Sequence, residues 1–246
     1  SPNPKLNNPL WQSLEFYSLL NRAWTFGGVR EQDKEVVGQF AKLGIGPGLT
    51  FDPAALTEAQ RNGLLRAAQT AYQRIMLHGQ ENGEMRNGWR FATNLGSYGN
   101  NHLLASAIGM MGYGANRAEE ALYLPVYLDH ENQPLHSDRN YRIHFTAENL
   151  PPVNEFWSVT LYTRPENQLK ENPLNRYAFG DRTPGLKRNA DGSIDIYVQQ
   201  NKPEDDSANW LPSGESGPIW LILRMYGPQQ AALAGGYVPP PIQRMD

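Results

Sequence analysis

The stretch that decides the fold runs from Asn154 to Tyr226 and reads NEFWSVTLYTRPENQLKENPLNRYAFGDRTPGLKRNADGSIDIYVQQNKPEDDSANWLPSGESGPIWLILRMY. It contains four strand-like runs, which cover residues 156–162, 174–179, 194–198 and 218–226. Joints rich in glycine, proline, asparagine and aspartate separate the runs, and such residues are typical of turns. No helical pattern lies between the runs, so we expect consecutive strands to pair in an antiparallel manner.

The strand pattern begins upstream of this stretch, at Leu122. Residues 122–128 and 141–145 also alternate with a period of two, which is the period of a β-strand. The run 218–226 is almost continuously apolar, and this predicts a central strand that is buried on both faces. We therefore predict an antiparallel β-sandwich over residues 121–246.

Residues 1–120 have a helical pattern and contain one short strand, Trp89–Phe91. Apolar residues recur at helical spacing in 9–26 and again in 36–43, where the glycine-rich segment 44–48 ends the pattern. A third helix starts near Asp52-Pro53 or at Thr57, because both positions carry N-capping residues. The overall fold class is therefore α+β, with a helical N-terminal layer before the sandwich. We expect the following residues in the core: Leu14, Tyr17, Phe40, Leu64, Ile75, Tyr123, Phe145, Trp157, Val159, Leu161, Ile196, Trp220 and Leu223.

The composition excludes several classes of function. The 246 residues include no cysteine, so thiolate metal sites, iron–sulfur clusters and a cysteine nucleophile are excluded. The formal charge of −3 and the scattered Lys and Arg argue against nucleic acid as a partner. No run of about 18 apolar residues occurs, so we expect no membrane span. We predict neither a metal nor a cofactor, because the cluster of His130, His136 and Asp138 fits an exposed polar loop better.

Several short blocks carry a resemblance to a known family. They are Lys42–Gly48 with Phe51-Asp52, Gly88–Phe91, Gly96–Gly99, Glu119–Tyr123 and Leu150–Ser158. In this order they resemble the C-terminal part of the bacterial domain of unknown function 1254/1214 family, namely the 1214 domain and its preceding helical region. The resemblance implies a jelly-roll topology, an exported protein in the periplasm or secreted, and a companion 1254 domain upstream.

The chain departs from the family pattern in the connector Asp129–Asp138. Family members carry two glycines in this connector, whereas the segment here reads DHENQPLHSD. The turn therefore has to form without the residue that most easily adopts positive φ.

The joints between the strands hold the first group of candidate site residues. Asn175, Arg176, Asp181 and Arg182 lie within eight positions, and an arginine fork suits a carboxylate or phosphate ligand. The alternative is a buried Asp181–Arg182 pair that ties two loops together, and we expect that pair to form.

A second group of candidates combines aromatic and polar side chains. Asn209 and Trp210 suit the recognition of hydroxyl groups and sugar rings, although a loop tryptophan also commonly plugs the end of a sandwich. Further candidates from the first half of the chain are Trp89, Arg90, Tyr98 and Asn100, together with His102, which can act as a general acid or base near neutral pH.

Two functions remain open at this stage. The first is a binding module for a small polar or carbohydrate-like ligand, or an assembly module that packs against the companion domain or forms a homo-oligomer. The second is a metal-independent hydrolase of a sugar-like, amide or ester substrate, with His102 and Asp181 as candidate catalytic residues. No complete catalytic set is present in the sequence, so the existence of an enzyme activity stays open.

Overall fold

The computed structural model describes residues 9–205 and 208–245. The chain divides into two compact units, the first ending at Gln80 and the second starting at Glu81. The second unit includes the β1–β2 hairpin and α4 as well as the sandwich, because β2 pairs with β3 of the sandwich. The division falls at residue 80, so the predicted domain boundary at residue 120 lies inside the second unit. The predicted fold class is confirmed, since a helical region precedes sheets that are largely antiparallel.

The first unit consists of helices. Its α-helices are α1 (Glu15–Gly27), α2 (Lys34–Gly38) and α3 (Glu58–Glu81), and short 3-10 turns lie at Pro9–Gln12, Glu31–Asp33, Ala41–Leu43 and Pro53–Ala55. A small core forms around Tyr17, Ile45, Phe51 and Leu56. Both proposed capping signals are used. Asp52 caps the 3-10 turn through Ala54 N–H, and Thr57 with Gln60 forms the capping box before α3.

Asn21 joins α1 to the glycine-rich segment that follows α2. Its side-chain amide donates to Gly44 O at 2.8 Å and Leu49 O at 2.9 Å, and it accepts from Gly46 N–H at 2.7 Å. Only 3% of Asn21 is exposed, so these bonds form out of contact with water. One side chain thus forms hydrogen bonds with three backbone groups of the turn 44–49.

The second helix is shorter than the sequence pattern predicts. Because α2 ends at Gly38 and a separate 3-10 turn follows, Phe40 does not continue the helical face of Val37. Val37 is buried, whereas Phe40 is 41% exposed, so the prediction that Phe40 belongs to the core is wrong.

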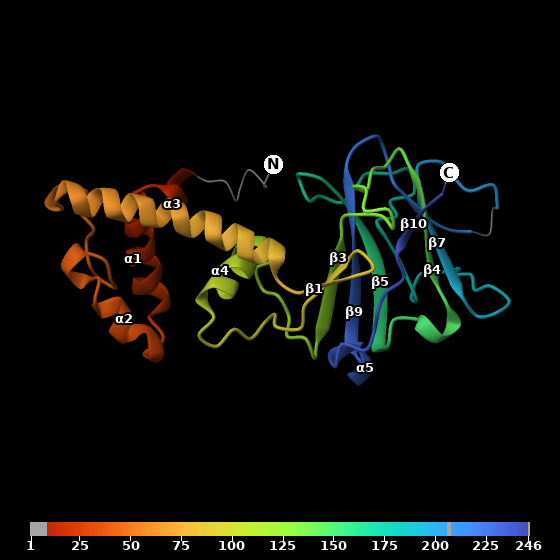
Figure 1. Ribbon diagram of the computed structural model, residues 1–246, viewed down its shortest axis with the longest axis horizontal. Coiled ribbons are helices and arrows are strands. Elements are labelled where there is room, and N and C mark those ends of the chain that lie inside the picture. The colour runs from red at the N-terminus through yellow and green to blue at the C-terminus, as the bar shows by residue number, and fades with distance from the viewer. Residues whose placement is uncertain (1–8, 206–207, 246) are drawn as a thin grey trace. The chain divides into compact units, whose positions relative to one another are not determined.

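Two sheets form the sandwich in the second unit (Figure 1). The larger sheet has the order β1-β2-β3-β9-β5-β6, and the smaller sheet has the order β10-β4-β7-β8. All neighbouring strands pair antiparallel except β7 and β8, which are parallel. The strands are β1 (Glu84–Arg86), β2 (Trp89–Phe91), β3 (Ala121–Val126), β4 (Asn140–Phe145), β5 (Val153–Thr163), β6 (Ala178–Gly180), β7 (Ile194–Gln199), β8 (Asn209–Pro212), β9 (Ile219–Pro228) and β10 (Ile242–Met245); the helices are α4 (His102–Met111) and α5 (Gln230–Leu233), with a 3-10 turn at Ala147–Asn149.

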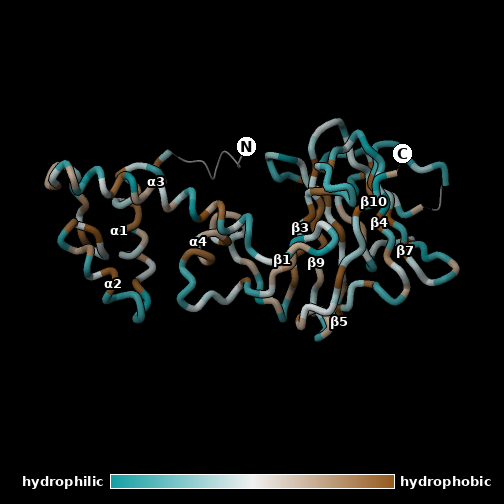
Figure 2. Tube along the Cα trace, in the orientation of Figure 1, coloured by the Kyte–Doolittle hydropathy of each residue, from teal (hydrophilic) through white to brown (hydrophobic). Residues whose placement is uncertain are grey.

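The core of the sandwich lies between the two sheets. Most predicted core residues are buried there or in the helical unit, namely Tyr17, Phe145, Trp157, Val159, Leu161, Ile196 and Leu223. Leu14, Leu64, Ile75, Tyr123 and Trp220 are half-buried. Hydrophilic residues gather in the loops that join the strands (Figure 2).

The central strand β9 buries one face and not two. It lies between β3 and β5 as predicted, and Ile219, Leu221, Leu223 and Met225 point into the core. On the outer face of the larger sheet Ile222 is 9% exposed, whereas its neighbours on that face, Trp220, Arg224 and Tyr226, are only half-buried. The prediction that this strand is buried on both faces is therefore wrong.

The connector after β3 forms its turn with asparagine in place of glycine. Asn132 has φ of 60°, a left-handed conformation that asparagine tolerates better than most residues. The buried Asp129 carboxylate accepts from Glu131 N–H and Gln133 N–H, both at 2.9 Å. These bonds hold the turn that the family pattern assigns to glycine.

The proline-rich tail ties the hairpin β1–β2 to the rest of the second unit. Trp89 is fully buried, and its indole N–H donates to Pro240 O at 2.7 Å. Asn87 donates to Pro239 O at 2.9 Å, after which β10 pairs with the edge of β4. The extended prolines thus supply carbonyl acceptors just before an edge strand. Among the described helices, none is long and apolar enough to cross a bilayer.

The Asn21 contacts predict the behaviour of one variant. We expect Asn21→Ala to destabilise the helical unit by about 2–3 kcal/mol, because three backbone groups lose their partner and one of them, Gly46 N–H, is buried. Hydrogen–deuterium exchange of residues 44–51 measures this loss as faster exchange. The exposed neighbour Arg22→Ala serves as the control and should leave exchange unchanged. Equal protection in the Asn21→Ala variant and the parent chain would contradict the assignment.

Candidate functional site

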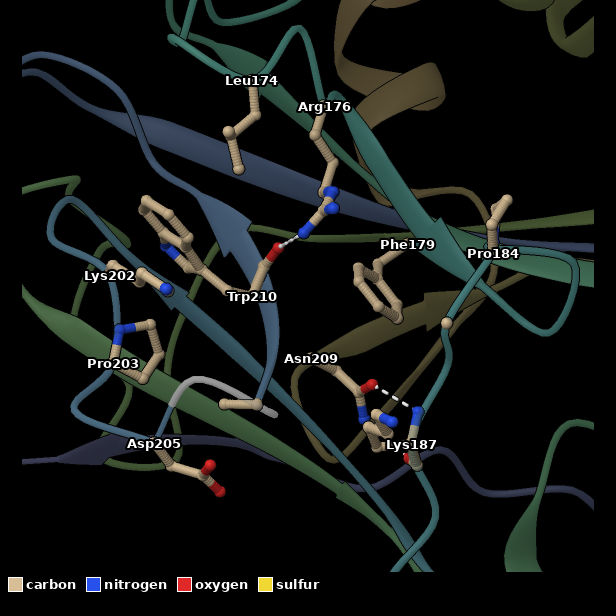
Figure 3. Close-up of a pocket in the computed structure, with 12 residues that line it drawn as sticks. Leu174, Arg176, Phe179, Pro184, Lys187, Lys202, Pro203, Asp205, Asn209 and Trp210 are labelled. Atoms are coloured by element: carbon tan, nitrogen blue, oxygen red, sulfur yellow. Dashed lines mark hydrogen bonds between the residues drawn. The ribbon is translucent and has the colours of Figure 1, made fainter.

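A cavity of about 320 Å³ opens between the loop that precedes β6, the loop after β6, and β8 (Figure 3). We call it the Arg176–Trp210 pocket. Cationic, aromatic and small side chains share its wall. The lining residues are Leu174, Arg176, Phe179, Pro184, Gly185, Lys187, Lys202, Pro203, Asp205, Ala208, Asn209 and Trp210.

Arg176 is held in place from its backbone and from its head group. The Asn172 side chain accepts from Arg176 N–H at 3.1 Å and donates to Arg176 O at 2.9 Å. The guanidinium donates to Trp210 O at 2.9 Å and lies 5.4 Å from the centre of the Phe179 ring. One head-group contact reaches across to β8, so Arg176 links the edges of the two sheets.

Lys187 is fixed by a second asparagine in the same way. Asn209 accepts from Lys187 N–H and donates to Lys187 O, both at 2.8 Å. Its second amide hydrogen goes to Asp195 O, also at 2.8 Å, so the buried amide uses both of its donors. Asn209 therefore fastens the loop after β6 to strand β7.

Trp210 forms the aromatic wall of the pocket. Its indole N–H donates to Gln199 O at 2.9 Å, which fixes the orientation of the ring on β8. The ring remains half-buried, and the backbone carbonyl of Trp210, not the ring, meets Arg176 (Figure 3). A fixed and partly exposed indole is suited to contact with the flat face of a ligand ring.

Positive charge prevails in this pocket. Three of the described lining residues are cationic, namely Arg176, Lys187 and Lys202, and one, Asp205, is anionic. Within the described part of the chain, neither Arg176 nor Lys187 forms an ion pair. Since a carboxylate or phosphate matches the arginine fork, the pocket is suited to an anionic group.

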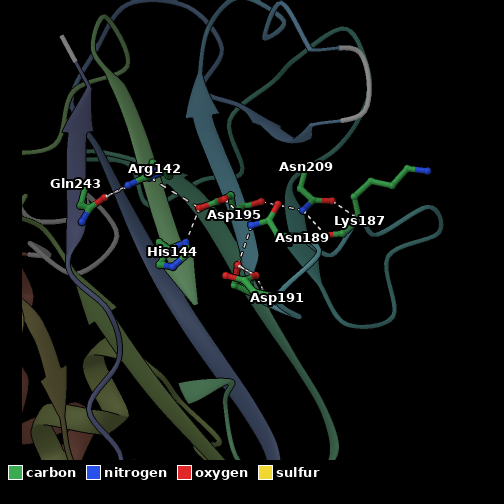
Figure 4. A network of polar contacts seen from close by, with 9 residues as sticks. Arg142, His144, Lys187, Asn189, Asp191, Asp195, Asn209 and Gln243 are labelled. Carbon is green, nitrogen blue, oxygen red and sulfur yellow. Dashed lines mark hydrogen bonds and ion pairs between the residues drawn. The ribbon is translucent and has the colours of Figure 1, made fainter. Parts of the chain in front are cut away.

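A polar network on the smaller sheet supports the wall behind Asn209 (Figure 4). The Asp195 carboxylate meets His144 Nδ1 at 2.8 Å and Asn189 Nδ2 at 2.8 Å, and Arg142 approaches it at 3.8 Å. Arg142 also donates to Gln243 on β10 at 2.7 Å. The network therefore crosses three strands and holds β7 where Asn209 attaches.

The adjoining turn carries a carboxylate with a shifted pKa. The Ser193 hydroxyl and then the Ser193 N–H donate to Asp191, and these bonds hold the pKa of Asp191 below its usual value. Gly192 follows with φ of 82°, a conformation that glycine adopts without strain, so the chain turns tightly before β7.

The structure brings three of the predicted site residues together in the pocket: Arg176, Asn209 and Trp210. Asn175 lies instead on a separate open groove of about 1040 Å³, where its side chain accepts from the Tyr177 hydroxyl at 3.2 Å. The backbone of Asn175 is left-handed, with φ of 49°, and its side chain does not follow that of Arg176 into the pocket.

The predicted Asp181–Arg182 pair is wrong. Asp181 accepts from Trp157 N–H at 3.1 Å. Arg182 lies over the Phe156 ring at 4.3 Å and meets Glu155 at 3.6 Å, with 62% of its side chain exposed. Both residues lie in the turn that follows β6, which Thr183 N–H closes onto Gly180 O, and the two side chains find separate partners there.

The candidates from the first half of the chain do not line the pocket. Trp89 is a core residue, as its contact with Pro240 requires. Arg90 points to the opposite side of β2 from Trp89. Tyr98 and Asn100 belong to the loop before α4, and His102 is the exposed first residue of that helix.

The histidines of the connector do not gather into one site. His136 meets Asp138 at 3.2 Å, whereas His130 accepts from Arg244 N–H at 3.3 Å. Among the described residues, no group of three or more histidine, aspartate or glutamate side chains is placed to hold a metal ion.

Sequence reasoning missed Asn172, Phe179, Lys187 and Lys202. Asn172 stands before a proline, where an asparagine commonly bonds to the backbone a few residues ahead, so a turn signal was present. Nothing in the sequence marks Lys187 and Lys202 as site residues, because lysines are mostly exposed wherever they occur. Only the fold brings these two to the same pocket.

The fold and this pocket define an α+β protein whose sandwich carries a cationic, aromatic-walled pocket at its edge. Residues 120–230 match the family model described as "Protein of unknown function (DUF1214)". This match confirms the resemblance to that family predicted from the sequence.

Two solved structures are similar to this chain, and the first of them supports the fold. The VPA0106 protein from Vibrio parahaemolyticus aligns with 100% of this chain at 25% identity and a TM-score of 0.65, and this chain covers 57% of its length. A putative uncharacterized protein from Burkholderia cenocepacia aligns with 80% of this chain, covering 47% of that protein, at 19% identity and a TM-score of 0.42. No curated protein matches the chain.

The contacts of Asn209 predict a loss of stability. We expect Asn209→Ala to lower the free energy of unfolding by about 2–3 kcal/mol, because three backbone groups lose a well-placed partner. Urea unfolding followed by tryptophan fluorescence measures the change. Asn140→Ala, at an exposed position on β4, is the matched control and should change stability by less than about 0.5 kcal/mol. A similar small effect for both variants would refute the role given to Asn209.

Proposed function

We propose that the sandwich binds a small anionic, hydroxyl-bearing ligand in the Arg176–Trp210 pocket. The observation that carries the proposal is the arginine itself. Its backbone is clamped by Asn172, its head group is oriented by Trp210 O, and its charge has no carboxylate partner in the described part of the chain. A protein that fixes a cation without neutralising it provides a ready partner for an anion.

The size of the pocket limits the ligand. Ligand pockets commonly have volumes of about 300–1,000 Å³, so a cavity of about 320 Å³ suits a single small molecule. The Trp210 ring supplies a flat wall for a sugar ring, and the cations supply a place for a carboxylate or phosphate. A sugar acid or sugar phosphate satisfies both requirements at once.

Binding is favoured over the hydrolase alternative by the chemistry of the lining. Glycoside hydrolysis uses two carboxyl groups about 5–9.5 Å apart. Among the described lining residues Asp205 is the one carboxylate, and none is a histidine. The candidates His102 and Asp181 lie outside this lining, so the proposal assigns no reaction to the pocket.

An exported location and a companion domain belong to the same proposal. They rest on the resemblance to the 1254/1214 family, and the greater length of the VPA0106 protein is compatible with a further domain in relatives. Assembly with such a domain, or with a second copy, leaves the pocket assignment unchanged.

The test compares ligands that differ in one charge. We expect isothermal titration to detect galacturonate and not galactose, since the carboxylate is the group that Arg176 recognises. Arg176→Gln should weaken galacturonate binding by about tenfold or more, which corresponds to the loss of a charge-assisted hydrogen bond. Arg188→Gln removes an exposed charge outside the pocket and serves as the control.

Two results would overturn the proposal. One is equal binding of galactose and galacturonate, since the charge would then play no part. The other is an equal effect of Arg176→Gln and Arg188→Gln. Binding of inorganic phosphate in competition with galacturonate would support the same site and favour a sugar phosphate.

A further inference from the structure

The outer face of the larger sheet carries a row of aromatic rings away from the Arg176–Trp210 pocket. Tyr127 follows β3, Trp220 lies on β9 and Tyr162 on β5, and these are neighbouring strands. The Tyr127 and Trp220 rings are 5.5 Å apart at 28°, and the Trp220 and Tyr162 rings are 4.9 Å apart at 22°. The three rings therefore stack face to face across the sheet.

This stacking decides which part of each ring a partner can reach. The faces are occupied by neighbouring rings, so the row presents ring edges to the outside. Ring edges carry the positive part of the aromatic quadrupole. Sugars and nucleic-acid bases use ring faces for stacking, and those faces are taken here.

Arginines cover both ends of the row. Arg164 lies 5.0 Å from the centre of the Tyr127 ring. Arg224 lies 5.6 Å from the Tyr162 ring, and it donates to the Tyr162 hydroxyl at 2.8 Å and the Thr160 hydroxyl at 2.6 Å. Arg90 lies on the same face, because it alternates with the buried Trp89 on β2, and Trp89 pairs with Val126, the residue before Tyr127. Burial raises the pKa of Tyr127, and the charges of Arg164 and Arg90 act in the opposite direction.

No acidic side chain balances this charge. Among the described residues, Arg90, Arg164 and Arg224 form no ion pair. In addition, the Trp220 indole N–H is buried and has no hydrogen-bond acceptor. A buried donor without an acceptor is destabilising, so an acceptor brought by a partner would remove that penalty.

We propose that this aromatic–arginine face, defined by Arg90, Tyr127, Tyr162, Arg164, Trp220 and Arg224, binds a short acidic peptide segment of a partner protein. Three unbalanced cations and exposed ring edges both favour carboxylates. The segment is short because the face is small: from Trp220 to Arg224 is about 14 Å along the strand, and the four neighbouring strands β2, β3, β9 and β5 span about 14 Å. The resulting area is far below the roughly 800 Å² that each partner buries in a stable complex of folded proteins.

The experiment measures binding of a fluorescein-labelled decaglutamate peptide by anisotropy, with labelled decalysine as the opposite charge. We expect saturable binding of decaglutamate that weakens as salt is added, and no binding of decalysine. The double variant Arg90→Gln, Arg164→Gln should weaken binding by roughly tenfold, because two charge contacts are lost. Arg66→Gln, Arg74→Gln removes the same total charge from exposed positions on α3 and is the matched control.

A second measurement does not depend on the arginine variants. The Trp220 indole N–H resonance, assigned through Trp220→Phe, should shift when decaglutamate is added and stay unchanged with decalysine. Arg176→Gln should bind decaglutamate as the parent does, which separates this face from the pocket.

Several results would overturn the proposal. Absence of decaglutamate binding would do so, and so would equal weakening in the α3 control, which indicates non-specific attraction. Preference for polygalacturonate or single-stranded DNA over the peptide would assign the face to another polymer. Self-association that Arg90→Gln, Arg164→Gln abolishes would make a second copy of the chain the occupant.

Discussion

The side-chain amide of Asn209 is the contact on which the pocket and its surroundings depend. This one side chain bonds to both the N–H and the C=O of Lys187, as a neighbouring strand would, and it also donates to the backbone oxygen of Asp195. Asn172 does the same for Arg176. Two amides therefore give irregular loops the fixed backbone that a sheet would otherwise provide, and each places a cation at the rim of the same cavity.

The way in which these loops are held explains why the site lies at the edge of the sandwich. Strand β6 has three residues and ends the larger sheet, and β8 ends the smaller sheet. Neither edge continues into another strand, so the Arg176 bond to Trp210 O closes the gap between them. An exposed edge is an aggregation hazard that proteins commonly block with charge, and here Arg176 supplies such a charge.

The sequence predicts the regular part of the fold and only a portion of the site. Alternation located β3, β4, β5 and β7, because a half-buried strand imposes that pattern on its residues, and a continuous apolar run located β9. Sequence reasoning failed for the outer face of β9, where Trp220 packs against Tyr127 and Tyr162 and Tyr226 packs against Phe156 on the surface. It also failed for Asp181 and Arg182, since adjacency in sequence says nothing about which partner each side chain meets. Lys187 and Lys202 could not be found, because only the folded loops bring them to Arg176.

The bond between Trp89 and Pro240 has a consequence for how the sandwich assembles. Its two partners are separated by 151 residues, and the bond closes the hairpin β1–β2 onto the segment that leads into β10. Contacts between such distant residues bring a large loop-closure entropy before they give any stabilisation, and folds rich in them form slowly. The segment from Pro239 to Met245 contacts both the β1–β2 hairpin and β4. Until this segment docks, the hairpin and the edge of β4 lack these partners and stay open to competing strands.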